Sequence, residues 1–172
     1  MLEQSAEYFL EQINSVSEIK GFSAPFRWLS NFYPIIPIIY QGIEYKSTET
    51  FYQAMKTLDK KDRLHISTLK PGKAKAYGSP ENEEFIVRDD WLDLKLKVME
   101  FALRHKFSQE FFKNILLATG DMYIEETNTW NDVFFGCTPD GVGQNHLGKL
   151  VMKLREELKQ GLDLLDFEFS VV

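Results

Sequence analysis

Apolar residues recur along most of this chain with the period of a helix. Apolar side chains between Tyr8 and Val16 share one side of a helix predicted over 2–19, and a stripe of leucines predicts another over 145–160, stopped by Gly161. The same pattern, with turn residues at the ends, predicts helices over 48–58, 60–69, 72–78, 89–105 and 109–119, the last capped by Ser108.

Strand signals are few and short. Residues 35–40 and 43–46 flank Gln41-Gly42, a pair typical of a tight hairpin, and 122–125 predicts a third strand. Residues 127–146 form a long loop rich in Asn, Asp and Gly, and loops of that length are often functional. The pattern therefore predicts an α+β fold: a predominantly α-helical single domain, 1–172, with a small β-sheet.

Composition fits one folded domain. The chain has 172 residues, of which 44% are hydrophobic and 27% charged, a balance typical of globular rather than disordered proteins. The net charge of −6 argues against a long nucleic-acid footprint but leaves room for a local basic pocket that holds one or two phosphates.

The sequence gives weaker evidence about the cellular compartment of the protein. Cys137 is the only cysteine, so no intrachain disulfide can form. The first residues lack the basic and apolar stretches of a secretory signal, and the aliphatic patch 35–39 is too short to span a bilayer. We therefore expect a cytoplasmic protein that does not bind membranes.

Several chemistries have little support. The histidines His65, His105 and His146 are far apart and lack the spacing of zinc ligands. Neither a Gly-x-Ser-x-Gly elbow nor a Walker-type phosphate loop is present. The sequence therefore predicts no metal and no cofactor.

The predicted helix 48–58 has two distinct faces. An apolar face begins at Phe51, whereas Glu49, Gln53 and Lys56 recur on a polar one. At about 100° per residue, Lys56 returns to within about 20° of Glu49. A solvated polar face is the commoner outcome for such a pattern, so the spacing alone leaves a catalytic and a structural interpretation open.

Three further clusters carry candidate chemistry. They are Arg88-Asp89-Asp90-Trp91, the acids and aromatics from Glu125 to Gly136, and the glycine-rich stretch Gly141–Lys149 that leads into the last helix. Backbone N–H groups at such a helix start can bind an anion, and acids beside aromatic rings suit a sugar or base. Each cluster also has an ordinary structural interpretation as a helix start or a surface loop.

Taken together, these stretches resemble the NADAR domain of YbiA-like N-glycosidases over about residues 22–158. The blocks that carry the resemblance are, in order, Leu29–Pro34, Tyr45–Lys56, Arg88–Trp91, Met99, Lys106-Phe107, Leu117–Gly120, Glu125–Thr127, Asn131-Asp132, Gly136, Gly141–Gly148 and Met152–Arg155.

The resemblance implies a mostly helical α+β domain that cleaves N-glycosides. The implied substrates are a ribosylaminopyrimidine phosphate of riboflavin biosynthesis, or ADP-ribose attached to guanine, as in ADP-ribosylated DNA or RNA. Glu49, Lys56 and Asp132 fall on the positions implied to be catalytic. The implied substrate-binding residues are Asn31, Phe32, Tyr52, Gln53, Arg88, Trp91, Glu125, Phe135, Gly136, Asn145 and Gly148.

The chain also departs from the family pattern. Thr50 and Phe135 stand where the family often has His and Trp, and the loop is about two residues longer around Thr129-Trp130. Lys56 has two open roles, as a Schiff-base nucleophile or as a phosphate contact. The alternative function is a module that binds ADP-ribose or another NAD-derived ligand without turnover. We expect a small nucleotide-like partner, and nothing implies an obligate protein partner.

Overall fold

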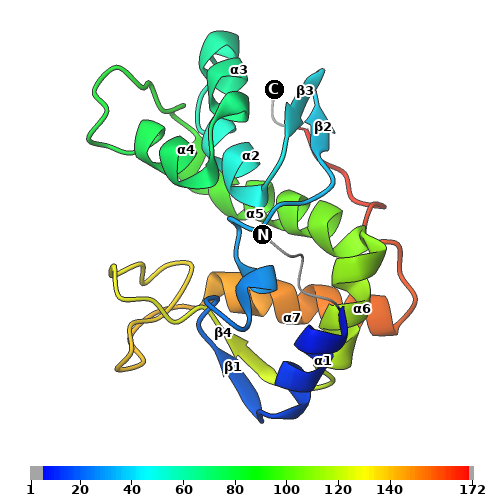
Figure 1. Ribbon diagram of the computed structural model, residues 1–172. Coiled ribbons are helices and arrows are strands. Elements are labelled where there is room, and N and C mark those ends of the chain that lie inside the picture. Colours follow the sequence, from blue (N-terminus) through cyan, green and yellow to red (C-terminus); the bar gives the residue numbers. More distant parts are fainter. Residues whose placement is uncertain (1–5, 171–172) are drawn as a thin grey trace. The chain divides into compact units, whose positions relative to one another are not determined.

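A computed structural model describes residues 6–170 and confirms a predominantly helical α+β fold (Figure 1). The described residues form seven α-helices, one 3₁₀ turn and four short strands. Their bounds are α1 (Ala6–Asn14), β1 (Glu18–Lys20), η1 (Arg27–Leu29), β2 (Ile38–Tyr40), β3 (Ile43–Tyr45), α2 (Thr48–Ala54), α3 (Lys60–Thr68), α4 (Pro71–Tyr77), α5 (Trp91–Ser108), α6 (Glu110–Ala118), β4 (Tyr123–Glu125) and α7 (His146–Lys159).

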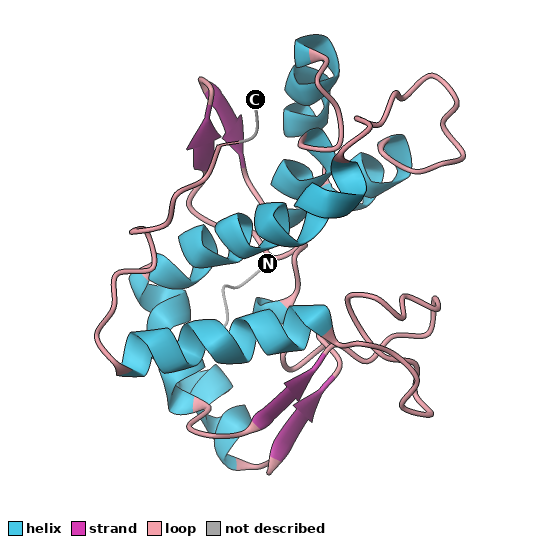
Figure 2. Ribbon diagram, turned by 180° about the vertical axis from the view of Figure 1, so that it is seen from behind, coloured by secondary structure: helices cyan, strands magenta, loops and turns pink. Residues whose placement is uncertain are grey.

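The strands form two separate pairs, drawn in magenta in Figure 2. Internal contacts also divide the chain into two compact units. Within the described residues, unit 1 comprises 6–30 and 107–166, and unit 2 comprises 31–106 and 167–170. None of the helices within 6–170 is long and apolar enough to cross a membrane.

Unit 1 is built on a parallel pair of strands. β1 pairs with β4, with Ile19 opposite Ile124, and both of these side chains are fully buried. α7 packs against β4, while α1 and α6 pack together. The helix predicted over 2–19 therefore ends early, at Asn14, because residues 18–20 pair with a strand more than a hundred positions away. Residues 2–5 lie outside the described part of the chain.

Unit 2 begins with the predicted hairpin. β2 and β3 pair antiparallel across Gln41 and Gly42, whose φ angles of 50° and 76° are the left-handed values that a two-residue turn requires. Helices α2, α3 and α4 contact one another beside this hairpin. The ring of Phe51 on α2 meets Tyr45 on β3 edge to face, with centroids 5.4 Å apart, so the hairpin and α2 share one core.

A capping box fixes the start of α2. The Ser47 hydroxyl accepts a hydrogen bond from the Thr50 N–H at 3.1 Å, and the Thr50 hydroxyl accepts one from the Ser47 N–H at 3.3 Å. These bonds satisfy two N–H groups that a helix start otherwise leaves without partners. Thr50, which stands where the family often has His, thus has a clear structural role.

Helix α2 ends at Ala54, four residues before the predicted end. Beyond it the chain tightens into a turn, because the N–H groups of Lys56 and Thr57 donate to carbonyls only three residues back, and tertiary partners bind the carbonyls that follow. The Arg88 N–H donates to the Lys56 carbonyl at 2.8 Å, and the Arg63 Nε donates to the Thr57 carbonyl at 2.8 Å. Lys56 therefore lies in the turn that follows α2, not on the helix itself.

The later helices begin and end within three residues of the predicted bounds, the largest difference being at the end of α5, and one predicted cap is wrong. Ser108 is the last residue of α5, and α6 starts after Gln109, which makes no side-chain capping bond. Asn145 caps α7 by accepting a hydrogen bond from the Gly148 N–H. Gly161 follows α7 with a φ of 76°, as expected for a helix stop.

Candidate functional site

In unit 2, Glu49 lies in the first turn of α2 with only 6% of its surface exposed. Its Oε1 atom accepts a hydrogen bond of 2.7 Å from the Nε2 of Gln53, one turn further along. The Asn31 carbonyl accepts from the Glu49 N–H at 3.0 Å and from the Thr48 hydroxyl at 2.9 Å. Asn31 therefore fixes the helix start that presents the Glu49 carboxylate.

Of the two polar atoms of the Gln53 amide, only Nε2 has a hydrogen-bond partner among the described residues. Its Oε1 atom is buried and accepts no hydrogen bond from the described residues. It lies directly over Gly78, where an added Cβ atom would come within 2.4 Å of it. A buried amide oxygen without a donor is costly in a folded protein, so this atom offers a ligand an acceptor beside the Glu49 carboxylate.

Lys56 lies close to Gln53, because both side chains approach the backbone of Gly78. Its Nζ donates to the Gly78 carbonyl at 2.9 Å and lies 5.7 Å from the centroid of the Tyr52 ring. Burial lowers the pKa of the Lys56 amine, the Glu49 carboxylate partly offsets this, and the positive charge of Lys75 lowers the pKa further. A larger share of this lysine is thus in the neutral, nucleophilic form than in an exposed lysine.

Aromatic rings and an arginine border this group. Tyr52 meets Trp91 edge to face with centroids 5.0 Å apart, and Trp91 is 8% exposed. The Arg88 side chain binds Asp90 through Nε and Nη2, while its backbone N–H holds the turn at Lys56. The paired contact leaves the Arg88 guanidinium oriented by Asp90.

Unit 2 thus joins most of its predicted residues through direct contacts. These are Asn31, Glu49, Tyr52, Gln53, Lys56, Arg88 and Trp91. Phe32 is 42% exposed, and its ring lies near Gly72 in α4. Gly78 was not predicted from the sequence; its lack of a side chain lets the Gln53 amide and the Lys56 amine approach the same backbone.

In unit 1, the Asp132 carboxylate accepts hydrogen bonds from backbone N–H groups of the loop that contains it. Its Oδ1 atom accepts hydrogen bonds from the N–H groups of Phe134 and Phe135, at 3.1 and 2.9 Å. Its Oδ2 atom accepts none from the residues that the structure describes. One carboxylate oxygen thus fixes the loop and the other is left for solvent or a ligand. Asp132 as a catalytic residue stays a prediction.

Glu125 and Gly136 are buried in the same unit. The Glu125 carboxylate accepts hydrogen bonds from the hydroxyls of Thr127 at 2.7 Å and Tyr123 at 3.0 Å. At Gly136, an added Cβ atom would lie only 2.2 Å from the Glu126 carbonyl. This close backbone approach explains the glycine by packing alone.

Asn145 and Gly148 join the loop to α7. The Asn145 Oδ1 accepts from the Glu126 N–H at 3.1 Å, and its Nδ2 donates to the Ile124 carbonyl at 3.0 Å. A Cβ atom on Gly148 would lie 2.2 Å from that same Ile124 carbonyl. Both residues therefore hold α7 against β4, and their contact with a substrate stays a prediction. The expectation that Glu49, Lys56, Trp91, Asp132 and Asn145 converge also stays a prediction.

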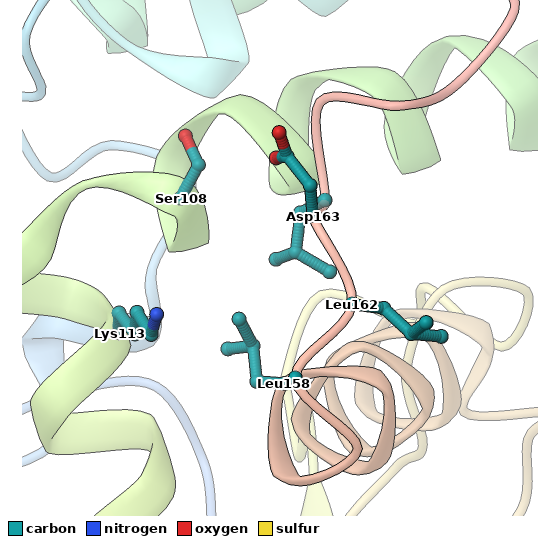
Figure 3. A pocket seen from close by; sticks show the side chains of 7 residues that line it. Ser108, Lys113, Leu158, Leu162 and Asp163 are labelled. Atoms are coloured by element: carbon teal, nitrogen blue, oxygen red, sulfur yellow. The ribbon is translucent and has the colours of Figure 1, made fainter.

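Unit 1 also has a hollow away from these residues. It has a volume of about 240 Å³ and lies where the start of α6 meets the end of α7 (Figure 3). Its lining includes Ser108, Lys113, Leu158 and Asp163, none of which was predicted to bind substrate. Within residues 6–170, no group of three or more His, Cys, Asp or Glu side chains is placed to hold a metal ion.

The family model for the NADAR domain matches residues 13–159 of this chain. The chain belongs to the NADAR domain family. The NMR structure of the E. coli protein YbiA has the same fold, with a TM-score of 0.71 and 31% sequence identity, covering 90% of this chain and 92% of that one. Both the family and the fold class expected from sequence are therefore confirmed.

Curated NADAR relatives carry two kinds of name. N-glycosidase YbiA of Escherichia coli is 37% identical over 71% of this chain and 76% of its own, and an N-glycosidase of Nostoc punctiforme is 34% identical over 81% and 90%. A riboflavin biosynthesis protein of Vibrio vulnificus is 38% identical over 77% of this chain, which spans only 36% of that longer relative. These relatives indicate an N-glycosidase-type enzyme.

Proposed function

We propose that this chain hydrolyses the N-glycosidic bond of a ribosylated, nucleotide-like substrate and needs no metal ion to do so. The observation that carries the proposal is the group in unit 2: the buried Glu49 carboxylate bonded to Gln53, next to Lys56, whose pKa burial lowers. An acid and an amine beside one another are more than a binding module needs.

Cleavage of a ribosyl C1–N bond builds positive charge on the sugar and negative charge on the departing nitrogen. In the proposed mechanism, Glu49 gives a proton to that nitrogen and later takes one from the attacking water. Gln53 supports this role because its Nε2 holds the carboxylate in place at 2.7 Å. Its buried Oε1 is left to accept a hydrogen bond from the substrate.

Lys56 takes the nucleophilic role in this proposal. Ring opening breaks the C1–O4 bond, passes the proton of the glycosidic nitrogen to O4 and leaves a C1=N bond to the base. The neutral amine of Lys56 adds to C1 and its proton passes to the base nitrogen; Glu49 then protonates that nitrogen, the C1–N bond to the base breaks, and the base leaves as a neutral amine. The resulting C1=N bond to Lys56 is then hydrolysed by water, which returns the free amine and releases the sugar as an aldehyde. The lowered pKa of Lys56 favours this role over a phosphate contact, which would use a fully charged amine.

The substrate class follows from the relatives and from the rings near the group. Relatives named for N-glycosidase activity and for riboflavin biosynthesis support a ribosylated base or pyrimidine. The edge-to-face pair of Tyr52 and Trp91 gives the group an apolar border of the kind that suits a planar base. Both ADP-ribosyl-guanine and a ribosylaminopyrimidine phosphate fit this class.

The test is product formation. The protein is incubated separately with ADP-ribosylated guanine DNA, with the ribosylaminopyrimidine phosphate and with free ADP-ribose, and the release of base or amine is followed by mass spectrometry. We expect release from one of the first two substrates, and a release rate about 10²- to 10⁴-fold lower after Glu49→Gln. Binding of ADP-ribose without release from either substrate would instead support the non-catalytic module.

A further inference from the structure

Arg63 in unit 2 differs from the other buried arginines that the structure describes. Within residues 6–170, three buried arginines each bind a carboxylate: Arg88 binds Asp90, Arg104 binds Glu100 and Arg155 binds Glu156. Arg63 is only 5% exposed and makes no ion pair with any described carboxylate. A guanidinium keeps its charge, and a buried charge is costly without a counter-charge, so a negative group beside Arg63 would be strongly favoured.

The hydrogen bonds of Arg63 use only part of its guanidinium. Its Nε donates to the Thr57 carbonyl at 2.8 Å, and its Nη1 donates to the Gln41 Oε1 at 2.9 Å. Both acceptors are neutral. Its Nη2 is buried and has no hydrogen-bond partner among the described residues. Two bonds thus hold the guanidinium in place, and the N–H groups of Nη2 are left to bind an acceptor.

A second buried donor lies close to Arg63. Helix α3, which carries Arg63, packs against β3, which carries Tyr45 (Figure 1). The Tyr45 hydroxyl is buried and also has no hydrogen-bond partner among the described residues. Burial raises the pKa of Tyr45 to about 12, and the nearby charge of Arg63 partly offsets this rise. At neutral pH the hydroxyl therefore keeps its proton and can donate it in a hydrogen bond.

The charge around these two donors is positive. Burial lowers the pKa of Arg63, the Tyr45 hydroxyl raises it, and the positive charge of Arg88 lowers it further, so the two guanidinium groups lie near each other. A phosphate group matches this arrangement. It accepts several hydrogen bonds from guanidinium and hydroxyl groups at once, and its charge stabilises both buried cations.

The donors have a route to solvent and a link to the candidate site. Gln41 is an exposed residue of the hairpin turn, so turning its side chain into solvent opens the Nη1 edge of Arg63 to an anion. On its other side, Arg63 binds the carbonyl of Thr57, the residue directly after Lys56. Arg63 and Lys56 are therefore held by one short segment of the chain.

From these contacts we infer that Arg63 and Tyr45 form a phosphate-binding site, which holds the phosphate of the substrate beside Lys56. The site itself is argued from contacts within unit 2, whereas its assignment to the substrate rests on the proposed function. It gives the phosphate a partner other than Lys56, which the proposed mechanism uses as a nucleophile. The site thereby selects N-glycosides that carry a phosphate.

Thermal unfolding of the full-length protein tests the site without any turnover. The protein is titrated with inorganic phosphate, and separately with sodium chloride at the same ionic strength. We expect phosphate alone to raise the melting temperature, by roughly 5–10 °C at about 100 times its Kd. No rise beyond that given by chloride overturns the inference.

Tyr45→Phe separates a specific site from general stabilisation by phosphate. The variant keeps the ring that packs against Phe51 and removes only a buried hydroxyl without a partner, so without phosphate it should be at least as stable as the wild type. We expect the Kd for phosphate to rise about 10- to 100-fold. Tyr77→Phe is the matched control, because the Tyr77 hydroxyl already donates to Asp62 on α3, and its phosphate response should stay unchanged. An equal response in Tyr45→Phe and the wild type overturns the inference.

Kinetics decide whether the phosphate is that of the substrate. For an N-glycoside that is turned over, KM is compared with and without its phosphate group, and inorganic phosphate is tested as an inhibitor. We expect loss of the phosphate to raise KM at least tenfold, Tyr45→Phe to narrow that difference, and inorganic phosphate to compete with the substrate. Phosphate that binds without competing overturns the assignment to the substrate.

The two proposals fail in different ways. Stabilisation by phosphate that depends on Tyr45, with no turnover of any N-glycoside, supports the site and rejects the hydrolytic function. Turnover that is indifferent to phosphate and to Tyr45→Phe does the reverse. If Tyr45→Phe does not fold, Gln41→Gly decides the outcome. Glycine keeps the left-handed φ of 50° and frees Nη1 for the anion, so the Kd for phosphate should fall roughly twofold to tenfold, and an unchanged Kd overturns the inference.

Discussion

Replacing Glu49 with Gln removes the charge and the proton of the carboxylate while keeping its size. The new amide oxygen can still accept the hydrogen bond from the Gln53 Nε2, now between neutral groups. The loss of charge assistance costs on the order of 1 kcal/mol, and the loss of an acid from the first turn of α2 costs about 0.3–1 kcal/mol. Removing a charge that is only 6% exposed acts in the opposite direction.

These opposing contributions nearly cancel, so we expect the free energy of unfolding to change by no more than about 1 kcal/mol. For a domain of this size, that corresponds to a melting-temperature shift of roughly 2–4 °C. Turnover should fall far more, by about 10²- to 10⁴-fold, because general acid–base catalysis is typically worth that factor. Substrate binding should be largely retained, since the shape and one hydrogen bond survive.

The assay follows base release by mass under saturating substrate, alongside thermal unfolding of both proteins. Glu44→Gln is the matched control, since Glu44 is an exposed glutamate on β3 of the same unit. It should turn over substrate at the wild-type rate. If Glu49→Gln also does so, Glu49 is not the catalytic carboxylate, and Asp132 or Glu125 becomes the candidate.

Four other outcomes are expected. Borohydride should trap a covalent sugar adduct in the wild type and none in Lys56→Ala, by mass of the intact protein; an adduct of equal yield in the variant would rule out Lys56 as the nucleophile. The neutral amine prevails above its pKa, so the rate should rise as pH increases through the lowered pKa of Lys56; Lys75→Met removes a charge that lowers this pKa, and should move the rise to higher pH. A pH–rate profile that does not move would refute this coupling. Gly78→Ala places a Cβ atom 2.4 Å from the Gln53 amide oxygen, so turnover should fall at least tenfold through displacement of Gln53, and full activity would show that this contact is dispensable. Activity should survive dialysis against EDTA, and a loss that zinc or magnesium restores would contradict the metal-free mechanism.

Much of the fold could be predicted from local pattern. The hairpin at Gln41-Gly42 was predicted because only a few residue pairs tolerate two successive positive φ angles. The core stripe of α7 and its stop at Gly161 follow from helical period and from the conformational freedom of glycine. These features depend on neighbours within a few residues, so the sequence carries them directly.

The misplaced boundaries depend on distant partners. Residues 18–20 form a strand only because β4 supplies the other half of the ladder. Helix α2 ends at Ala54 in a turn whose Lys56 and Thr57 carbonyls are bound by the Arg88 N–H and the Arg63 side chain, although the residues beyond Ala54 include good helix formers. In both cases, tertiary hydrogen bonds outweigh a local preference of a few tenths of a kilocalorie per residue.

The features of the candidate site also fall into two kinds, those that the local sequence predicts and those that tertiary contacts determine. The sequence by itself determined the family, the helix that carries Glu49, and the types of side chain that are available for chemistry. Only the tertiary structure decided that Gln53 holds Glu49, that Gly78 brings Gln53 and Lys56 to one backbone segment, and that Asn145 holds α7 to β4. Burial and nearby charges arise from residues far apart in the chain, and they set the pKa of Lys56.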